Sequence, residues 1–168
     1  MGGGGGGGIS FSTLQSLEET AKQKLKETTG DVSRHVFISF ANEDMTEVNL
    51  LRGQAKNEKN DLQFDDFSVK EAFNSENADY IKRQIREKID RVSVTVVYLS
   101  DHSAQSEWVS WEIEESIRRG KGVVGVYKGD TPPVNLPKAF TENGCASVKW
   151  THDELMQAIE KASQKRSE

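Results

Sequence analysis

The sequence has little of what several classes of protein require. Among its 168 residues there is one cysteine, Cys145, which excludes an intramolecular disulfide and favours a reducing compartment such as the cytoplasm. The three histidines, His35, His102 and His152, lack metal-ligand spacing, so no metal site is predicted. No apolar run reaches the length of a membrane helix, and no signal-peptide core follows the start methionine. The chain is therefore expected to be soluble and cytoplasmic, with no membrane partner.

Phosphate-binding glycine motifs and an excess of positive charge are also missing. Neither G-x-G-x-x-G after a strand nor the P-loop pattern occurs, and the pair Gly120 and Gly122 follows a predicted helix rather than opening one. With 22 Lys and Arg against 27 Asp and Glu, the net charge of -5 argues against a nucleic-acid partner. No serine stands in a nucleophile elbow, so no nucleophilic triad is predicted.

Glycine is abundant at one place, Gly2 to Gly8, which holds seven of the 14 glycines. The domain organisation predicted from composition is a flexible tail over 1–9, an N-terminal helix with a linker over 10–31, and one domain over 32–168. The helix is predicted because apolar residues recur at three- and four-residue steps, at Leu14, Leu17, Ala21 and Leu25. It is either a brace packed on the domain or a helix for self-association or partner binding.

From Arg34 onward, the pattern alternates between strands and helices. Strands are predicted over 35–40, 61–66, 93–99, 122–127 and 146–150, and helices over 42–56, 76–89, 104–119 and 151–162. The run over 93–99 is almost entirely β-branched or aromatic, which suits a central strand covered on both faces. The sequence therefore predicts a three-layer α/β domain with a five-stranded parallel sheet, whose ligands lie at the carboxyl ends of the strands.

The segment over 103–117 carries the most informative side chains. At about 100° per residue, a helix here buries one stripe: Val109, Ile113 and Ile117. Trp108 and Glu112 are four residues apart along the edge of that stripe, so Glu112 is expected half-buried at a rim. An aromatic face beside a carboxylate suits a flat, cationic ring. The plainer alternative is a surface helix with a core tryptophan and solvated glutamates.

Trp111 is predicted to be exposed as an interface candidate, unless a neighbouring segment covers it.

Two motifs together resemble a known family. The segment Phe37-Ile-Ser-Phe40-Ala-Asn42 resembles the opening strand and loop of TIR domains, and Trp108-x-x-x-Glu112 matches their W-x-x-x-E. The chain looks most like the bacterial TIR-like, ThsB-type proteins of Thoeris antiphage systems. The resemblance implies a flavodoxin-like TIR fold that cleaves the nicotinamide–ribose bond of NAD, with Glu112 catalytic. It also implies substrate-binding roles for six residues: Phe40, Ala41, Asn42, Asp66, Ser68 and Trp108.

The resemblance further implies how such an enzyme works. NAD is the substrate, and neither a cofactor nor a metal is implied. The product is expected to be a cyclic ADP-ribose that reaches a separate effector protein, and homo-oligomers are expected on activation. The main alternative is a noncatalytic TIR adaptor that acts by homotypic assembly, and a further one is a flavodoxin-like ligand binder.

Overall fold

A five-stranded parallel sheet forms the centre of the domain. The computed structural model describes residues 34–57, 62–67 and 71–165. The strands are β1 (Arg34–Ser39), β2 (Leu62–Asp65), β3 (Val94–Tyr98), β4 (Gly122–Tyr127) and β5 (Ala146–Lys149), in the order β2-β1-β3-β4-β5. This is the flavodoxin-like strand order, so the predicted fold class is confirmed. The predicted tail over 1–9, the helix and linker over 10–31, and Ser68 lie outside the described residues.

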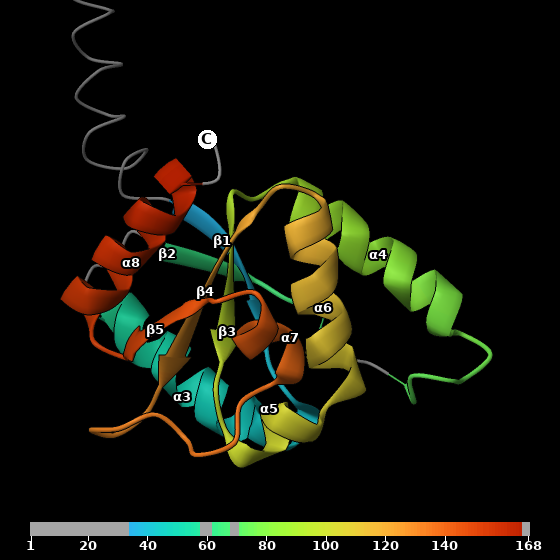
Figure 1. Ribbon diagram of the computed structural model, residues 1–168, viewed down its shortest axis with the longest axis horizontal. Coiled ribbons are helices and arrows are strands. Elements are labelled where there is room, and N and C mark those ends of the chain that lie inside the picture. The colour runs from blue at the N-terminus through green and yellow to red at the C-terminus, as the bar shows by residue number, and fades with distance from the viewer. Residues whose placement is uncertain (1–33, 58–61, 68–70, 166–168) are drawn as a thin grey trace, which may run out of the picture.

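Helices cover both faces of the sheet and make three layers (Figure 1). On one face lie α3 (Met45–Asn57) and α8 (His152–Lys165), and on the other lie α4 (Ala78–Asp90), α6 (Glu107–Arg118) and α7 (Lys138–Glu142). The 3-10 helix η2 (Asn42–Asp44) follows β1, and α5 (Asp101–Gln105) follows β3. In the described part of the chain, no helix combines the length and the apolar character needed to cross a membrane.

Alternating side chains of the strands divide the core between the two faces. Val36 and Ile38 of β1 pack in the cluster that includes α3 and α8, whereas Phe37 between them packs against α4. All five residues of β3 are buried, as expected of a central strand. The apolar face predicted for the helix of residues 76–89 is confirmed by four buried residues of α4: Ala78, Ile81, Ile85 and Ile89.

Two local features differ from the sequence prediction. The single helix predicted over 104–119 is two helices, α5 and α6, because Ser106 adopts an extended conformation and its side chain caps α6. The short helix α7 lies between the strands predicted over 122–127 and 146–150, where no helix was predicted, and it packs Phe140 against the sheet. The break at Ser106 turns the start of α6 towards the carboxyl ends of β1 and β3, where the strand order reverses.

Candidate active site

A small pocket lies beyond the carboxyl ends of β1 and β3. Its volume is about 180 Å³, and its walls come from the end of β1, η2, α5 and the start of α6. The lining residues are Phe40, Asn42, Glu43, His102, Gln105, Ser106 and Trp108. The structure thus brings together three predicted site residues, Phe40, Asn42 and Trp108, at the edge of the sheet that the fold predicts for ligands.

Local hydrogen bonds hold the walls of this pocket. Ser100 caps α5 by accepting from the Ser103 amide at 3.1 Å, and the Ser103 hydroxyl accepts from the Ser100 amide at 2.9 Å. Ser100 also donates its hydroxyl hydrogen to the carboxylate of Asp44 in η2. Burial raises the pKa of Asp44, and the bond from Ser100 only partly offsets this. The loops after β1 and β3 are therefore joined across the switch in strand order.

Glu112 lies one turn of α6 after the lining residue Trp108, inside the protein. Its side chain comes from the middle of α6 and has no exposed surface, so the expectation of a half-buried rim position is wrong. The hydroxyl of Ser39, the last residue of β1, donates to Glu112 Oε1 at 2.6 Å. Ser39 is fully buried as well. The hydroxyl of a facing strand residue thus supplies Oε1 with a hydrogen bond, which lowers the cost of burying this polar side chain.

Trp108 occupies the boundary between the pocket and the core. It is 6% exposed, and its Nε1 donates to the carbonyl oxygen of Glu71 at 2.7 Å. Its ring meets the ring of Phe73 edge to face, with centroids 4.9 Å apart. Trp108 therefore lines the pocket while most of its surface packs against other side chains, as in the core alternative for this tryptophan. Only the part of the Trp108 ring that lines the pocket is available for stacking with a ligand ring.

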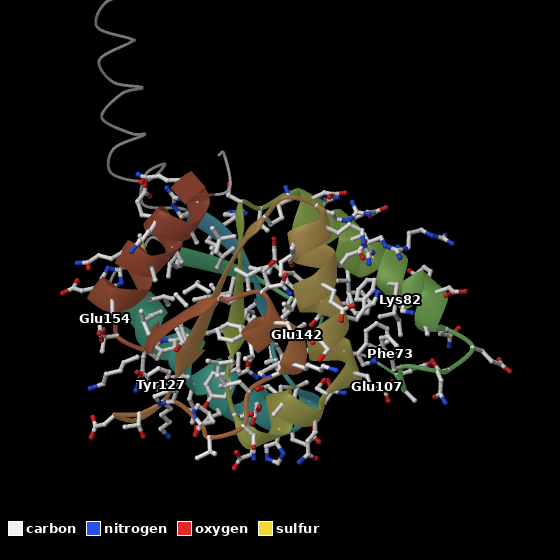
Figure 2. All side chains as sticks on the ribbon, in the orientation of Figure 1. Phe73, Lys82, Glu107, Tyr127, Glu142 and Glu154 are labelled. Carbon is white, nitrogen blue, oxygen red and sulfur yellow. The ribbon has the colours of Figure 1, made fainter. Side chains whose placement is uncertain are left out.

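Trp111 is partly buried, so the prediction of an exposed side chain is wrong and its alternative, partial cover by a neighbouring segment, is found. The cations of Lys82 and Arg86 on α4 lie 5.6 Å and 5.3 Å from the centroid of its ring, and the centroids of the Trp111 and Trp108 rings are 5.9 Å apart. Figure 2 shows Lys82 beside Phe73, where its ammonium lies 4.3 Å from the Phe73 centroid. These cation–π contacts attach α4 to the aromatic group around the candidate site.

The remaining predicted site residues lie apart from the pocket lining or outside the described chain. Ala41 is buried, and its carbonyl oxygen accepts from the Asp44 amide at 2.9 Å. Asp66 follows β2 and forms an ion pair with Arg52 of α3, with 3.4 Å between Oδ1 and Nη1. Arg52 also donates to the carbonyl oxygen of Phe64, so Asp66 takes part in joining β2 to α3. Ser68 lies outside the described residues.

Sequence reasoning missed Ser39 as the partner of Glu112 and His102 as a pocket residue. The signal for Ser39 was present, because it is the one hydroxyl in the strand segment Phe37-Ile-Ser-Phe40 and alternates onto the same face as Phe37. The pocket lining contains two aromatic side chains, one carboxylate and no lysine or arginine. Within the described ranges, no group of three or more His, Cys, Asp or Glu could hold a metal ion.

A larger pocket, of about 510 Å³, lies at the amino ends of β4 and β5 against α8, at the opposite end of these strands from the site. Its lining includes Val123, Ala146, Ala158 and Ala162. It contains none of the predicted site residues, whereas the smaller pocket contains three of them, and Glu112 lines neither pocket. Pocket size therefore does not identify the candidate site; the position of the buried carboxylate at the switch in strand order does.

Comparisons with known proteins agree with this arrangement of fold and motifs. The family model described as Thoeris protein ThsB, TIR-like domain, matches residues 37–132, which is more than half of the chain. The comparison with curated proteins gives no match. A solved structure of the TIR domains in the activated Roq1 resistosome, directly recognizing the pathogen effector XopQ, is similar at 18% identity and a TM-score of 0.42, over 80% of this chain and 84% of that one. The family match runs from β1 to the loop after β4 and so includes both Ser39 and Glu112. Because it covers more than half of the chain, the chain belongs to the family of ThsB TIR-like domains.

Proposed function

We propose that this protein cleaves the bond between nicotinamide and ribose in NAD, with Glu112 as the catalytic residue. The observation that carries the proposal is a fully buried carboxylate one helical turn from Trp108, which lines a pocket at the carboxyl ends of β1 and β3, in a chain of the ThsB TIR-like family. Trp108, one turn before Glu112, reaches both the pocket and the core. These two residues form the W-x-x-x-E motif of the family resemblance.

The chemistry requires little beyond one carboxylate. Nicotinamide leaves a pyridinium as a neutral molecule, so no general acid has to protonate it. Positive charge then develops on the ribose, and a carboxylate nearby stabilises it electrostatically. If water captures the ribosyl cation, the products are ADP-ribose, nicotinamide and one proton. If a nucleophilic atom of the same molecule captures it, the product is cyclic and the only other products are nicotinamide and the displaced proton.

We further propose that the product is a cyclic ADP-ribose that acts as a signal in antiphage defence and binds a separate effector protein. Cyclisation needs a pocket that excludes water and folds the adenine back towards the ribose. Two features of the lining support the proposal: η2, α5 and the start of α6 lie around the pocket, and its mostly polar residues include two aromatic ones, Phe40 and Trp108.

The candidate site is closed around Glu112 in this structure. The carboxylate has no exposed surface, and a pocket of about 180 Å³ is smaller than the roughly 300–1,000 Å³ of typical ligand sites. We propose that assembly into a homo-oligomer enlarges the pocket and gives NAD access to Glu112. The same burial favours a second candidate function, a noncatalytic TIR adaptor that assembles through its surfaces and in which Glu112 is only structural.

The test measures the release of nicotinamide from NAD by the purified protein, with chromatography as the assay. The protein is assayed both dilute and at a high concentration that drives assembly. We expect Glu112→Gln to lower the rate about 100-fold or more, because one lost electrostatic contact to a transition state costs about 3–4 kcal/mol. Glu114→Gln is the matched control, since Glu114 is an exposed carboxylate on the same helix.

The two candidate functions predict different results in that experiment. If light scattering shows assembly and no nicotinamide is released under any of the conditions, the adaptor function is supported and the enzyme is not. If Glu112→Gln is folded and retains full activity, Glu112 is not the catalytic residue. A cyclic product, as opposed to ADP-ribose, is identified by mass, because the cyclic compound is lighter by one water.

A further inference from the structure

A hydrogen bond from the Ser39 hydroxyl links β1 to the proposed catalytic carboxyl group of Glu112. The 2.6 Å separation is at the short end of the range for a hydroxyl that donates to an oxygen. Both residues have no exposed surface. A hydrogen bond in such surroundings is not weakened by competing water, so it fixes the orientation of the acceptor strongly.

The two residues of this bond are close along the chain to residues that line the pocket. α6 begins at the carboxyl edge of the sheet, and helical side chains lean towards the amino end of their helix. The Glu112 side chain therefore leans towards Trp108 and the pocket. Phe40, the residue after Ser39, lines the same pocket. Each member of the Ser39–Glu112 pair is thus close along the chain to a lining residue: Phe40 directly follows Ser39, and Trp108 lies one helical turn before Glu112.

We propose that Ser39 is a positioning residue for Glu112. Its hydroxyl holds Oε1, so that the carboxylate keeps one orientation towards the site when the pocket opens to substrate. This inference rests on the proposed function, because it concerns how the catalytic carboxylate is aimed. Ser39 itself is buried outside the pocket lining and acts through Glu112. Preorganised groups of this kind need no reorientation during the reaction, which is how they lower the barrier.

The structure offers a matched control at the same interface. Thr95 of β3 and Ser116 of α6 are both fully buried, and their hydroxyl oxygens lie 2.7 Å apart. Ser116 donates its single hydroxyl hydrogen to the Glu112 carbonyl oxygen at 2.7 Å, so Thr95 is the donor in the pair. Thr95→Val removes a buried hydroxyl between α6 and the sheet, as Ser39→Ala does, but removes nothing bonded to the Glu112 carboxylate.

The experiment measures kcat and KM for nicotinamide release in four proteins: the wild type, Ser39→Ala, Ser39→Thr and Thr95→Val. We expect Ser39→Ala to lower kcat about 10- to 100-fold, the range of one hydrogen bond to a charged group, with KM changed by less than about threefold. Ser39→Thr keeps the donor and should retain most of the rate. Thr95→Val should lose a similar amount of thermal stability and keep kcat.

Three results would overturn the inference: an unchanged kcat in Ser39→Ala, an increased kcat, or an equal loss in Thr95→Val. An increase would mean that Ser39 restrains Glu112 rather than aims it. A crystal structure of Ser39→Ala tests the same point without turnover. Several orientations of the Glu112 carboxylate support positioning, and the single orientation of the wild type contradicts it. If no protein turns over NAD but the carboxylate loses its orientation in Ser39→Ala, the proposed function fails and the positioning role of Ser39 is retained.

Discussion

Removing the charge of Glu115 should weaken the attachment of α4 to α6. Glu115 is 2% exposed and accepts hydrogen bonds from Arg86 of α4 at 3.0 Å and from Arg119 at 3.1 Å, and it also accepts one from Arg118. Burial alone raises the pKa of Glu115, but the hydrogen bonds from Arg119 and Arg86 and the charge of Arg118 outweigh it and lower the pKa below its ordinary value of 4.5. The carboxylate is thus stabilised in its charged form.

The size of the effect follows from how exposed each arginine is. Arg119 and Arg86 are 30% and 39% exposed, and after discounting for solvent screening each bond contributes about 1 kcal/mol. Arg118 is 66% exposed and adds little. Glu115→Gln keeps the shape of the side chain, and we expect it to lower the free energy of unfolding by about 2 kcal/mol at pH 7. With a denaturant slope of about 2 kcal/mol per molar, the urea midpoint falls by about 1 M.

Urea unfolding at several pH values tests both the size and the cause. Because the pKa of Glu115 is lower in the folded state, its contribution is present above the unfolded-state pKa and is lost as the pH falls through the folded-state value. The gap between the wild type and Glu115→Gln should therefore be full at pH 7 and shrink below about pH 4.5. Glu114→Gln, at an exposed position, should shift the midpoint little. A gap below about 0.5 kcal/mol at pH 7, or one that persists unchanged at pH 3, would refute the reasoning.

Two other substitutions follow from the structure. Gly125→Ala should lower the free energy of unfolding by about 1–3 kcal/mol, because a methyl group there would lie 2.6 Å from Leu99 Cδ1 and Phe140 Cζ. An unchanged melting temperature would contradict this and would show that α7, which carries Phe140, shifts freely. Asp44→Asn should change the pH dependence of stability. Because the folded-state pKa of Asp44 is raised, the wild type should gain stability relative to Asp44→Asn as the pH falls from 7 towards 4.5, and parallel profiles in thermal melts would contradict this.

The order of strands and helices could be predicted wherever the periodicity was long. α4 presents its isoleucines at steps of four, and the chain around β3 is almost entirely β-branched, so both elements were recognised within one or two residues of their ends. α7 has five residues, which is too short for a helical period to be visible after Pro137. The break at Ser106 had a signal in its serine cap, but Ser106 was taken as the interior of one helix over 104–119.

The sequence predicted which residues of α6 lie on one side of the helix, but not how deeply they are buried or what they contact. The spacing of Trp108 and Glu112 placed both on one side of α6, which is a local property of a helix. The depth of Glu112 depends on Ser39, 73 residues earlier, and the cover over Trp111 depends on Lys82 and Arg86 of another helix. Distances between elements are set by tertiary packing, and the periodicity of one helix carries no information about them.

The two buried polar contacts beneath α6 have a mechanical consequence. Glu112 bonds to Ser39 on β1, and one turn later Ser116 bonds to Thr95 on β3. Two directional contacts to different strands add to the close packing of this interface, and they oppose both sliding and rolling of the helix. α6 is therefore held to the sheet at two points. A rearrangement that admits a large substrate is expected in the segments around it, namely η2 and α5.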